Sequence, residues 1–154
     1  MTRRDIGEDT NGAGLRVGVA VATFNEAVTG PLAEGALGRL AELGVAHTTV
    51  VRVPGALELP VVARALAADH DAVVAVGAVI EGETDHYVHV ATQASAGLMA
   101  VSTDTGVPVG SALLTVRSAA HAIERSRPGP GNKGAEAAEA AVVAANAVAS
   151  LRRG

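Results

Sequence analysis

The sequence lacks cysteine and contains almost no aromatic residues. Its 154 residues include no Cys and no Trp, and only one Phe and one Tyr. The absence of cysteine excludes disulfides, a thiol nucleophile, iron–sulfur clusters and cysteine-ligated zinc. With so few aromatics, 33 Ala and 23 Val must supply much of the core. We therefore expect helices that pack closely through small side chains.

The chain also lacks an excess of basic charge and long apolar segments. It has 12 basic against 16 acidic residues and a net charge of −4, so it has no basic surface of the kind that binds nucleic acid. The start, MTRRDIGEDTNGAG, has no apolar segment typical of a secretory signal. No uncharged apolar stretch reaches the roughly 20 residues that span a membrane. We expect a cytoplasmic protein with no nucleic-acid and no membrane partner.

Apolar runs alternate with helical patterns along the chain. The runs are nearly continuous in apolarity, as in strands that are buried on both faces. They cover Val17–Ala22, Val45–Val53, Ala72–Ile80 and Val107–Val116. We expect residues 1–14 to form a flexible N-terminal arm. Residues 15–154 are expected to form one α/β domain, a three-layer sandwich around a four-stranded, mainly parallel sheet.

Helices are expected in the segments between and after the strands. The patterns predict them over residues 32–43, 57–68, 86–102, 118–125 and 135–151. The second of these segments has an apolar stripe with helical spacing. The stripe consists of Leu57, Val61, Ala65 and Ala68.

In open parallel sheets, ligands bind beyond the carboxyl ends of the strands. Phe24 follows the first strand, where it is either a core residue or a ring that stacks on a ligand. Because the core otherwise avoids aromatics, stacking gains weight. Glu58 follows a Pro-Gly turn, where it either binds a ligand or complements a helix dipole. Arg125, near the end of a short helix, either binds phosphate or serves as a helix-end cation.

Two histidines follow the third strand. His86 comes after a Gly-Glu-Thr-Asp loop, where a proton-transfer residue can meet a ligand; a solvent-facing side chain is the alternative. His86 and His89 are three residues apart, but only Glu83 lies close enough in sequence to complete a metal site. We therefore expect no metal.

The segment Gly129–Gly134 matches the pattern G-x-G-x-x-G, but no strand precedes it as the dinucleotide fingerprint requires. Lys133 is not followed by Ser or Thr, so the segment is not a P-loop. We interpret it as a tight turn that opens the last helix. Lys133 is also flanked by Asn and Gly, which is not the buried setting of a Schiff-base lysine.

Six segments taken in order, from about Val17 to Leu151, resemble the lumazine synthase family. They are Phe24-Asn25, Val53–Pro60 (VPGALELP), Gly77–His86 (GAVIEGETDH), Leu114-Thr115, Ala122–Arg125 (AIER) and Gly131–Gly134 (GNKG). The resemblance implies a flavodoxin-like fold and a transferase of riboflavin biosynthesis. The implied reaction condenses 5-amino-6-(ribitylamino)uracil with 3,4-dihydroxy-2-butanone 4-phosphate to 6,7-dimethyl-8-ribityllumazine, with no cofactor.

The resemblance also implies roles for individual residues. Phe24 would stack on the pyrimidine, and His86 would be the catalytic proton shuttle. The phosphate would be held by the main chain at Glu83 and Thr84 and by the Arg125 cation. The remaining contacts to the pyrimidine or its ribityl chain would come from Ala56, Leu57, Glu58, Ala78, Val79, Ile80, Ser111 and Lys133. The family's site is shared between subunits of a homo-oligomer, so we expect a pentamer. A hollow shell of sixty subunits, built from pentamers, is the alternative assembly.

The chain departs from the family pattern at four positions, one of which is Asp85, directly before His86. Glu81 stands where arginine is usual, and Leu57 and Ser111 each replace a common phenylalanine. These departures leave open a paralogue that forms shells or binds a flavin-type ligand without efficient catalysis. A generic flavodoxin-like binding domain is a third interpretation, but it leaves the Gly-Glu-Thr and Gly-Asn-Lys-Gly segments unexplained.

Overall fold

A computed structural model describes all 154 residues, in which strands alternate with helices. The strands are β1 (Arg16–Ala22), β2 (His47–Val53), β3 (Ala72–Ile80) and β4 (Val109–Val116). The helices are α1 (Glu26–Glu42), α2 (Leu59–Ala67), α3 (His86–Thr105), α4 (Ala119–Ser126) and α5 (Lys133–Arg152), and the short 3-10 helix η1 (Ala56–Glu58) precedes α2.

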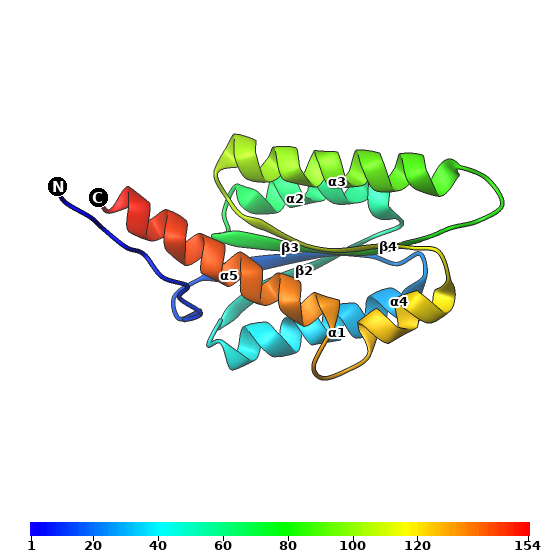
Figure 1. The fold of residues 1–154 in the computed structure, drawn as a ribbon, viewed down its shortest axis with the longest axis horizontal. Helices are drawn as coiled ribbons and strands as arrows, with labels where there is room; N and C mark the ends of the chain where they lie inside the picture. The colour runs from blue at the N-terminus through cyan, green and yellow to red at the C-terminus, as the bar shows by residue number, and fades with distance from the viewer.

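The four strands form one sheet in the order β2-β1-β3-β4, and every neighbouring pair is parallel. Helices α2 and α3 cover one face of this sheet, while α1, α4 and α5 cover the other (Figure 1). This strand order is that of flavodoxin-like folds. The structure thus confirms the expected three-layer α/β domain, with a wholly parallel sheet whose edge strands are β2 and β4.

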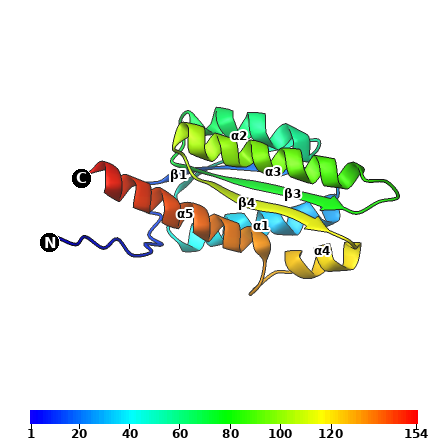
Figure 2. The same ribbon diagram turned by 45° about the horizontal axis from the view of Figure 1, so that its top comes forward.

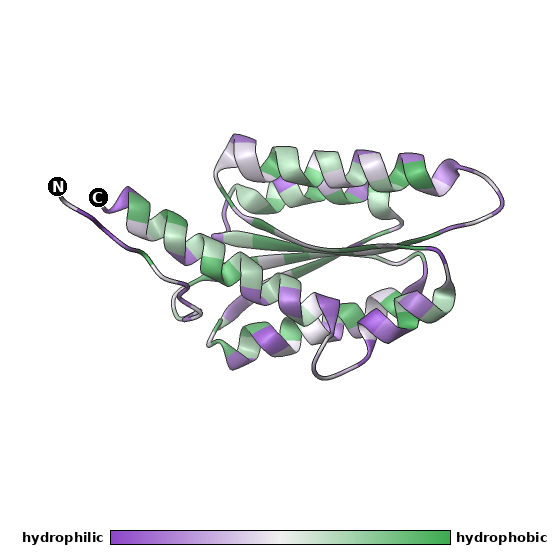
Figure 3. Cartoon of the chain, viewed as in Figure 1, coloured by the Kyte–Doolittle hydropathy of each residue, from purple (hydrophilic) through white to green (hydrophobic).

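The core consists of two apolar layers, one on each face of the sheet. Strand β3 is buried along its whole length except at Ile80, and it is mostly hydrophobic in Figure 3. Small residues allow the helices to approach closely, as the sequence predicted. In α3, for example, a Cβ on Gly97 would lie only 2.7 Å from Cγ of Pro60 in α2.

The buried face of α2 differs from the apolar stripe found in the sequence. Its buried residues are Leu59, Ala63, Leu66 and Ala67. The stripe itself is exposed, with Val61 70% and Leu57 51% exposed. Its other members, Ala65 and Ala68, are exposed as well. Because α2 is apolar around almost its whole circumference, spacing alone does not identify the face that meets the sheet.

The N-terminal arm lies beside the far end of α5 (Figures 1 and 2). Arg4 Nη2 donates a hydrogen bond to Ser150 O at 2.9 Å. Asn146 Nδ2 donates to Asp9 O at 2.8 Å and to Asn11 O at 2.9 Å. The flexibility expected for residues 1–14 stays a prediction.

None of the helices combines the length and apolar character needed to cross a bilayer.

Candidate active site

A pocket of about 230 Å³ lies at the carboxyl ends of β1 and β3, where ligands bind in this fold. Its walls come from the end of β1 and the following loop, from η1, from the end of β3 and from the start of α3. Three strand-end segments that the sequence singled out therefore meet here. Most of the lining is apolar, and Glu58 and His86 are its ionisable candidates.

Phe24 lines this pocket and is 73% exposed, so it is not a core residue. Its backbone N–H donates to Pro54 O at 2.9 Å, which ties the end of β1 to the loop that follows β2. The next residue, Asn25, has a left-handed backbone with φ 65°, and α1 begins directly after it. The ring is thus held on a short, sharply turning segment and leaves a face open to a ligand.

The Glu58 carboxylate has two different environments at its two oxygens. Oε1 accepts a hydrogen bond from the backbone N–H of Gly55 at 2.9 Å, which closes the turn into η1. Oε2 has no hydrogen-bond partner in the chain, and the side chain is exposed in the pocket. One oxygen therefore shapes the loop, while the other is free to accept a hydrogen bond from a ligand.

The end of β3 presents backbone without a strand neighbour on the side of β1. The ladder between the two strands ends at the pair Val21–Val76, and β3 continues to Ile80. Beyond the ladder, Asn25 Nδ2 donates to Ala78 O at 2.9 Å. Sequence reasoning missed the role of Asn25 in holding the end of β3. The tolerance of asparagine for the left-handed region was a signal that could have indicated a sharp turn there.

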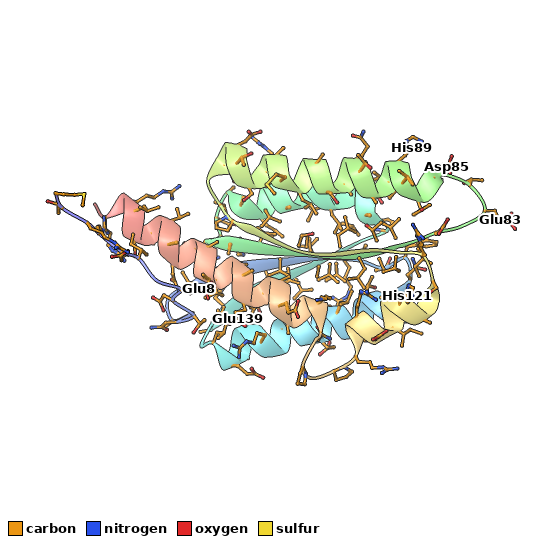
Figure 4. All side chains as sticks on the ribbon, in the orientation of Figure 1. Glu8, Glu83, Asp85, His89, His121 and Glu139 are labelled. Carbon is orange, nitrogen blue, oxygen red and sulfur yellow. The ribbon has the colours of Figure 1, made fainter.

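His86 is the first residue of α3 and lines the pocket. Tyr87 and Val90, which the sequence reasoning missed, line it as well; Val90 follows His86 by one helical turn, a spacing that would have indicated it. Glu83 and Thr84 lie outside this pocket, and Glu83 is at the outer part of the loop between β3 and α3 (Figure 4). No group of three or more side chains is arranged to hold a metal ion.

The other predicted residues, Ser111, Arg125 and Lys133, line a second hollow of about 420 Å³. It runs along β4 on the side that faces away from β3, where no further strand is paired. Arg125 Nη1 donates to His121 O of its own helix at 3.1 Å and makes no salt bridge. Lys133 Nζ pairs with Glu136 Oε2 at 2.9 Å. Apart from Glu83 and Thr84, which line neither, the predicted site residues are thus divided between two separate hollows.

The segment Gly129–Gly134 is a turn that opens the last helix, as the sequence interpretation held: residues 129–132 turn, and Lys133 and Gly134 begin α5. Gly129 and Gly131 have φ of 94° and 88°, values that favour glycine. Helix α5 begins at Lys133, after Asn132, whose side chain accepts a hydrogen bond from the Ala135 N–H. No strand precedes the turn, so it is not a dinucleotide-binding loop.

The family model described as 6,7-dimethyl-8-ribityllumazine synthase matches residues 14–149. A protein of that name from Mycobacteroides abscessus is 44% identical over 143 residues, or 92% of this chain and 89% of that protein. Another from Albidiferax ferrireducens is 43% identical over 145 residues, covering 92% and 90% of the two chains. A third from Saccharopolyspora erythraea is 44% identical over 140 residues, covering 90% and 85%. None of these names points to a shell-forming or flavin-binding protein without catalysis.

Proposed function

Because this chain belongs to the 6,7-dimethyl-8-ribityllumazine synthase family, we propose that it condenses 5-amino-6-(ribitylamino)uracil with 3,4-dihydroxy-2-butanone 4-phosphate. The product is 6,7-dimethyl-8-ribityllumazine, and phosphate and water are released. The observation that carries this proposal is the pocket of Phe24, Glu58 and His86 at the carboxyl ends of the parallel strands. It offers a flat apolar ring, a free carboxylate oxygen and a proton-transfer group.

The pyrimidine substrate fits the chemistry of this pocket. The exposed Phe24 ring offers a stacking face to the uracil. On the side of β1, Ala78–Ile80 have no strand neighbour, and the backbone groups there that Asn25 does not occupy can hydrogen-bond to the edge of the ring, in the plane where its polar atoms lie. The ribityl chain would run towards Ala56–Glu58, where the free Oε2 of Glu58 accepts a hydrogen bond from a hydroxyl group.

The second substrate brings a phosphate and a ketone. Arg125 is the candidate cation for the phosphate because its guanidinium has no acidic partner and can make paired hydrogen bonds to two oxygens. Attack of the amine on the ketone forms an imine and releases water. Elimination then breaks the bond between carbon and the phosphate oxygen and leaves an enol that becomes a ketone. The second amine attacks this ketone to close the ring, and a second water is released. His86 would accept and return protons in these steps, which lie in the working range of imidazole.

We infer that a complete site needs two copies of the chain, because the phosphate cation and the pyrimidine pocket belong to different hollows. The edge hollow of one copy would close over the Phe24 pocket of its neighbour. The exposed apolar face of α2, with Val61 70% exposed, supports such a contact near the pocket. A cytoplasmic pentamer is the assembly that we propose, and a shell built from pentamers is its larger alternative.

The assay mixes both substrates with the protein and follows the absorbance and green fluorescence of the lumazine. To test the shared site, Phe24→Ala and Arg125→Ala are assayed alone and after unfolding and refolding together. Random mixing should recover activity in about one site in four, because each site takes one half from each neighbour. A mixture of Phe24→Ala with His86→Ala is the control, since both changes lie in the same half and no intact site can form.

Failure of the first mixture to recover activity would contradict the shared site. Sedimentation that showed only a 15.3 kDa species at micromolar concentration would contradict it as well. Absence of lumazine formation by the unmodified, assembled protein would contradict the proposed activity itself.

A further inference from the structure

Asn132, at the start of α5, is 2% exposed and uses its side-chain amide in four directions. The two N–H groups of its Nδ2 are shared among three carbonyl oxygens, those of Pro31 at 3.3 Å, Ser126 at 3.0 Å and Arg127 at 3.1 Å. Its Oδ1 accepts from the Ala135 N–H at 3.0 Å. One buried side chain therefore connects α1, the end of α4 and the beginning of α5.

Helix capping alone accounts for only one of these contacts. An N-cap residue needs an oxygen that accepts from the first turn, and serine serves as well as asparagine. The donor side of Asn132 has a different role. The Ser126 and Arg127 carbonyls lie at the end of α4, where helix carbonyls have no partner within the helix. The amide nitrogen satisfies them and so fixes the end of α4 against α5.

The surroundings leave this side chain little freedom. A Cβ on Gly35 of α1 would collide with Asn132 Oδ1, and a Cβ on Gly134 would collide with Leu32 O. Helix α5 therefore lies directly on α1 at this point, with the amide of Asn132 filling the contact. Small residues at both positions are what this close approach requires.

Two residues of the edge hollow lie next to these anchored positions. Arg125 precedes Ser126, whose carbonyl Asn132 holds, and Lys133 follows Asn132 directly. We propose that Asn132 is a positioning residue for this half of the active site, which sets where Arg125 and Lys133 meet the substrates. The inference rests on the proposed function, because it assumes that Arg125 binds the phosphate.

Two variants disturb this anchor without changing a residue that lines either hollow. Asn132→Ser keeps a cap acceptor for Ala135 and removes the hydrogen bonds donated to the three carbonyls. Gly35→Ala leaves Asn132 in place and pushes its side chain from the α1 side. Gly38→Ala is the matched control. Gly38 lies on the same helix, and a Cβ there would meet nothing within 4 Å. Steady-state kinetics are measured on the assembled enzyme with each substrate varied in turn.

A displaced cation binds its substrate poorly, and misplacement of about 1 Å costs up to about 10²-fold in rate. We expect Asn132→Ser and Gly35→Ala to raise the KM for the butanone phosphate about tenfold, and to raise the KM for the uracil less. Gly38→Ala should leave both KM values unchanged. Should Asn132→Ser fail to assemble, Gly35→Ala against Gly38→Ala answers the question alone.

A purely structural role would lower the melting temperature and the amount of active enzyme with both KM values unchanged, and this result would overturn the inference. Arg125→Ala is measured alongside to separate the two claims. If Arg125→Ala raises the KM for the butanone phosphate and neither anchor variant does, the inference on Asn132 alone fails. If Arg125→Ala leaves the KM for the butanone phosphate unchanged, the assignment of Arg125 to the phosphate fails, and the inference on Asn132 fails together with that assignment.

Discussion

The two hollows that share the candidate site residues are built in different ways. The pocket around Phe24 is assembled from strand ends and the turns that follow them, and backbone hydrogen bonds such as that from Phe24 N to Pro54 O fix its walls. The hollow around Arg125 is assembled from a strand edge and two helix ends. Its geometry depends on how α4 and α5 pack, which the single amide of Asn132 controls.

This difference predicts how each hollow responds to substitution. In the strand-end pocket a side chain can be removed with little effect on its neighbours, because the backbone keeps its shape. In the edge hollow Arg125 makes no contact with an acidic side chain and depends on its helix for position. We therefore expect a substitution in the strand-end pocket to remove a single contact with the substrate. A substitution that alters the packing of α4 and α5 should shift several contacts of the edge hollow at once.

The largest effect is expected from Arg125→Ala. Hydrogen bonds to charged groups contribute about 1.5–3 kcal/mol, so the KM for the butanone phosphate should rise by up to about 10²-fold. Arg125→Lys should restore only part of this loss, because an ammonium does not make the paired contacts of a guanidinium. Arg127→Ala is the control, an exposed arginine two residues away that lines neither hollow. Intact phosphate affinity in Arg125→Ala would reduce Arg125 to a helix-end cation.

His86→Ala should lower kcat rather than raise either KM. General acid–base groups contribute about 10²–10⁴-fold. We expect a loss of only about 10- to 100-fold, since water can carry protons and positioning of the two reactants supplies much of the rate. His89→Ala is the matched control, because His89 lies outside the pocket on the same helix (Figure 4). Equal losses in the two variants would show that His86 acts only through α3.

Phe24→Ala should weaken binding of the ribitylaminouracil by about 1–3 kcal/mol, the range for an aromatic side chain stacked on a base. The free energy of unfolding should stay within about 0.5 kcal/mol, as for other surface changes, because the ring is 73% exposed. Ligand titration and thermal melts of the same sample separate the two quantities. Unchanged affinity would remove the stacking role, even though the ring lines the pocket.

The contrast between the hollows also explains what the sequence could predict. The strands and the pocket at their ends follow from continuous apolar runs and from the rule that ligands bind at carboxyl ends, so Phe24, Glu58 and His86 were within reach. The buried face of α2 was harder to predict, because Arg64 is the single polar residue that marks the outer side of a helix otherwise made of Leu, Pro, Val and Ala. The role of Asn132 depends on carbonyls up to 101 residues away in sequence, which no local pattern specifies.

The smallest effect concerns Leu57, at a position where the resemblance to the family leads us to expect phenylalanine. Leu57 lines the strand-end pocket and is 51% exposed, so a larger side chain there extends the pocket wall without entering the core. We expect Leu57→Phe to tighten binding of the ribitylaminouracil by about 1 kcal/mol, since aromatic pairs contribute about 0.5–1.5 kcal/mol beyond the area they bury. Leu57→Ala should weaken it by a similar amount. Isothermal titration of both variants with the uracil substrate measures the pair, and Ser111→Phe makes the same exchange in the edge hollow. Because that hollow depends on helix packing, its added ring should help less than the one at position 57. A larger gain from Ser111→Phe would show that the pyrimidine lies mainly against the neighbour's edge hollow.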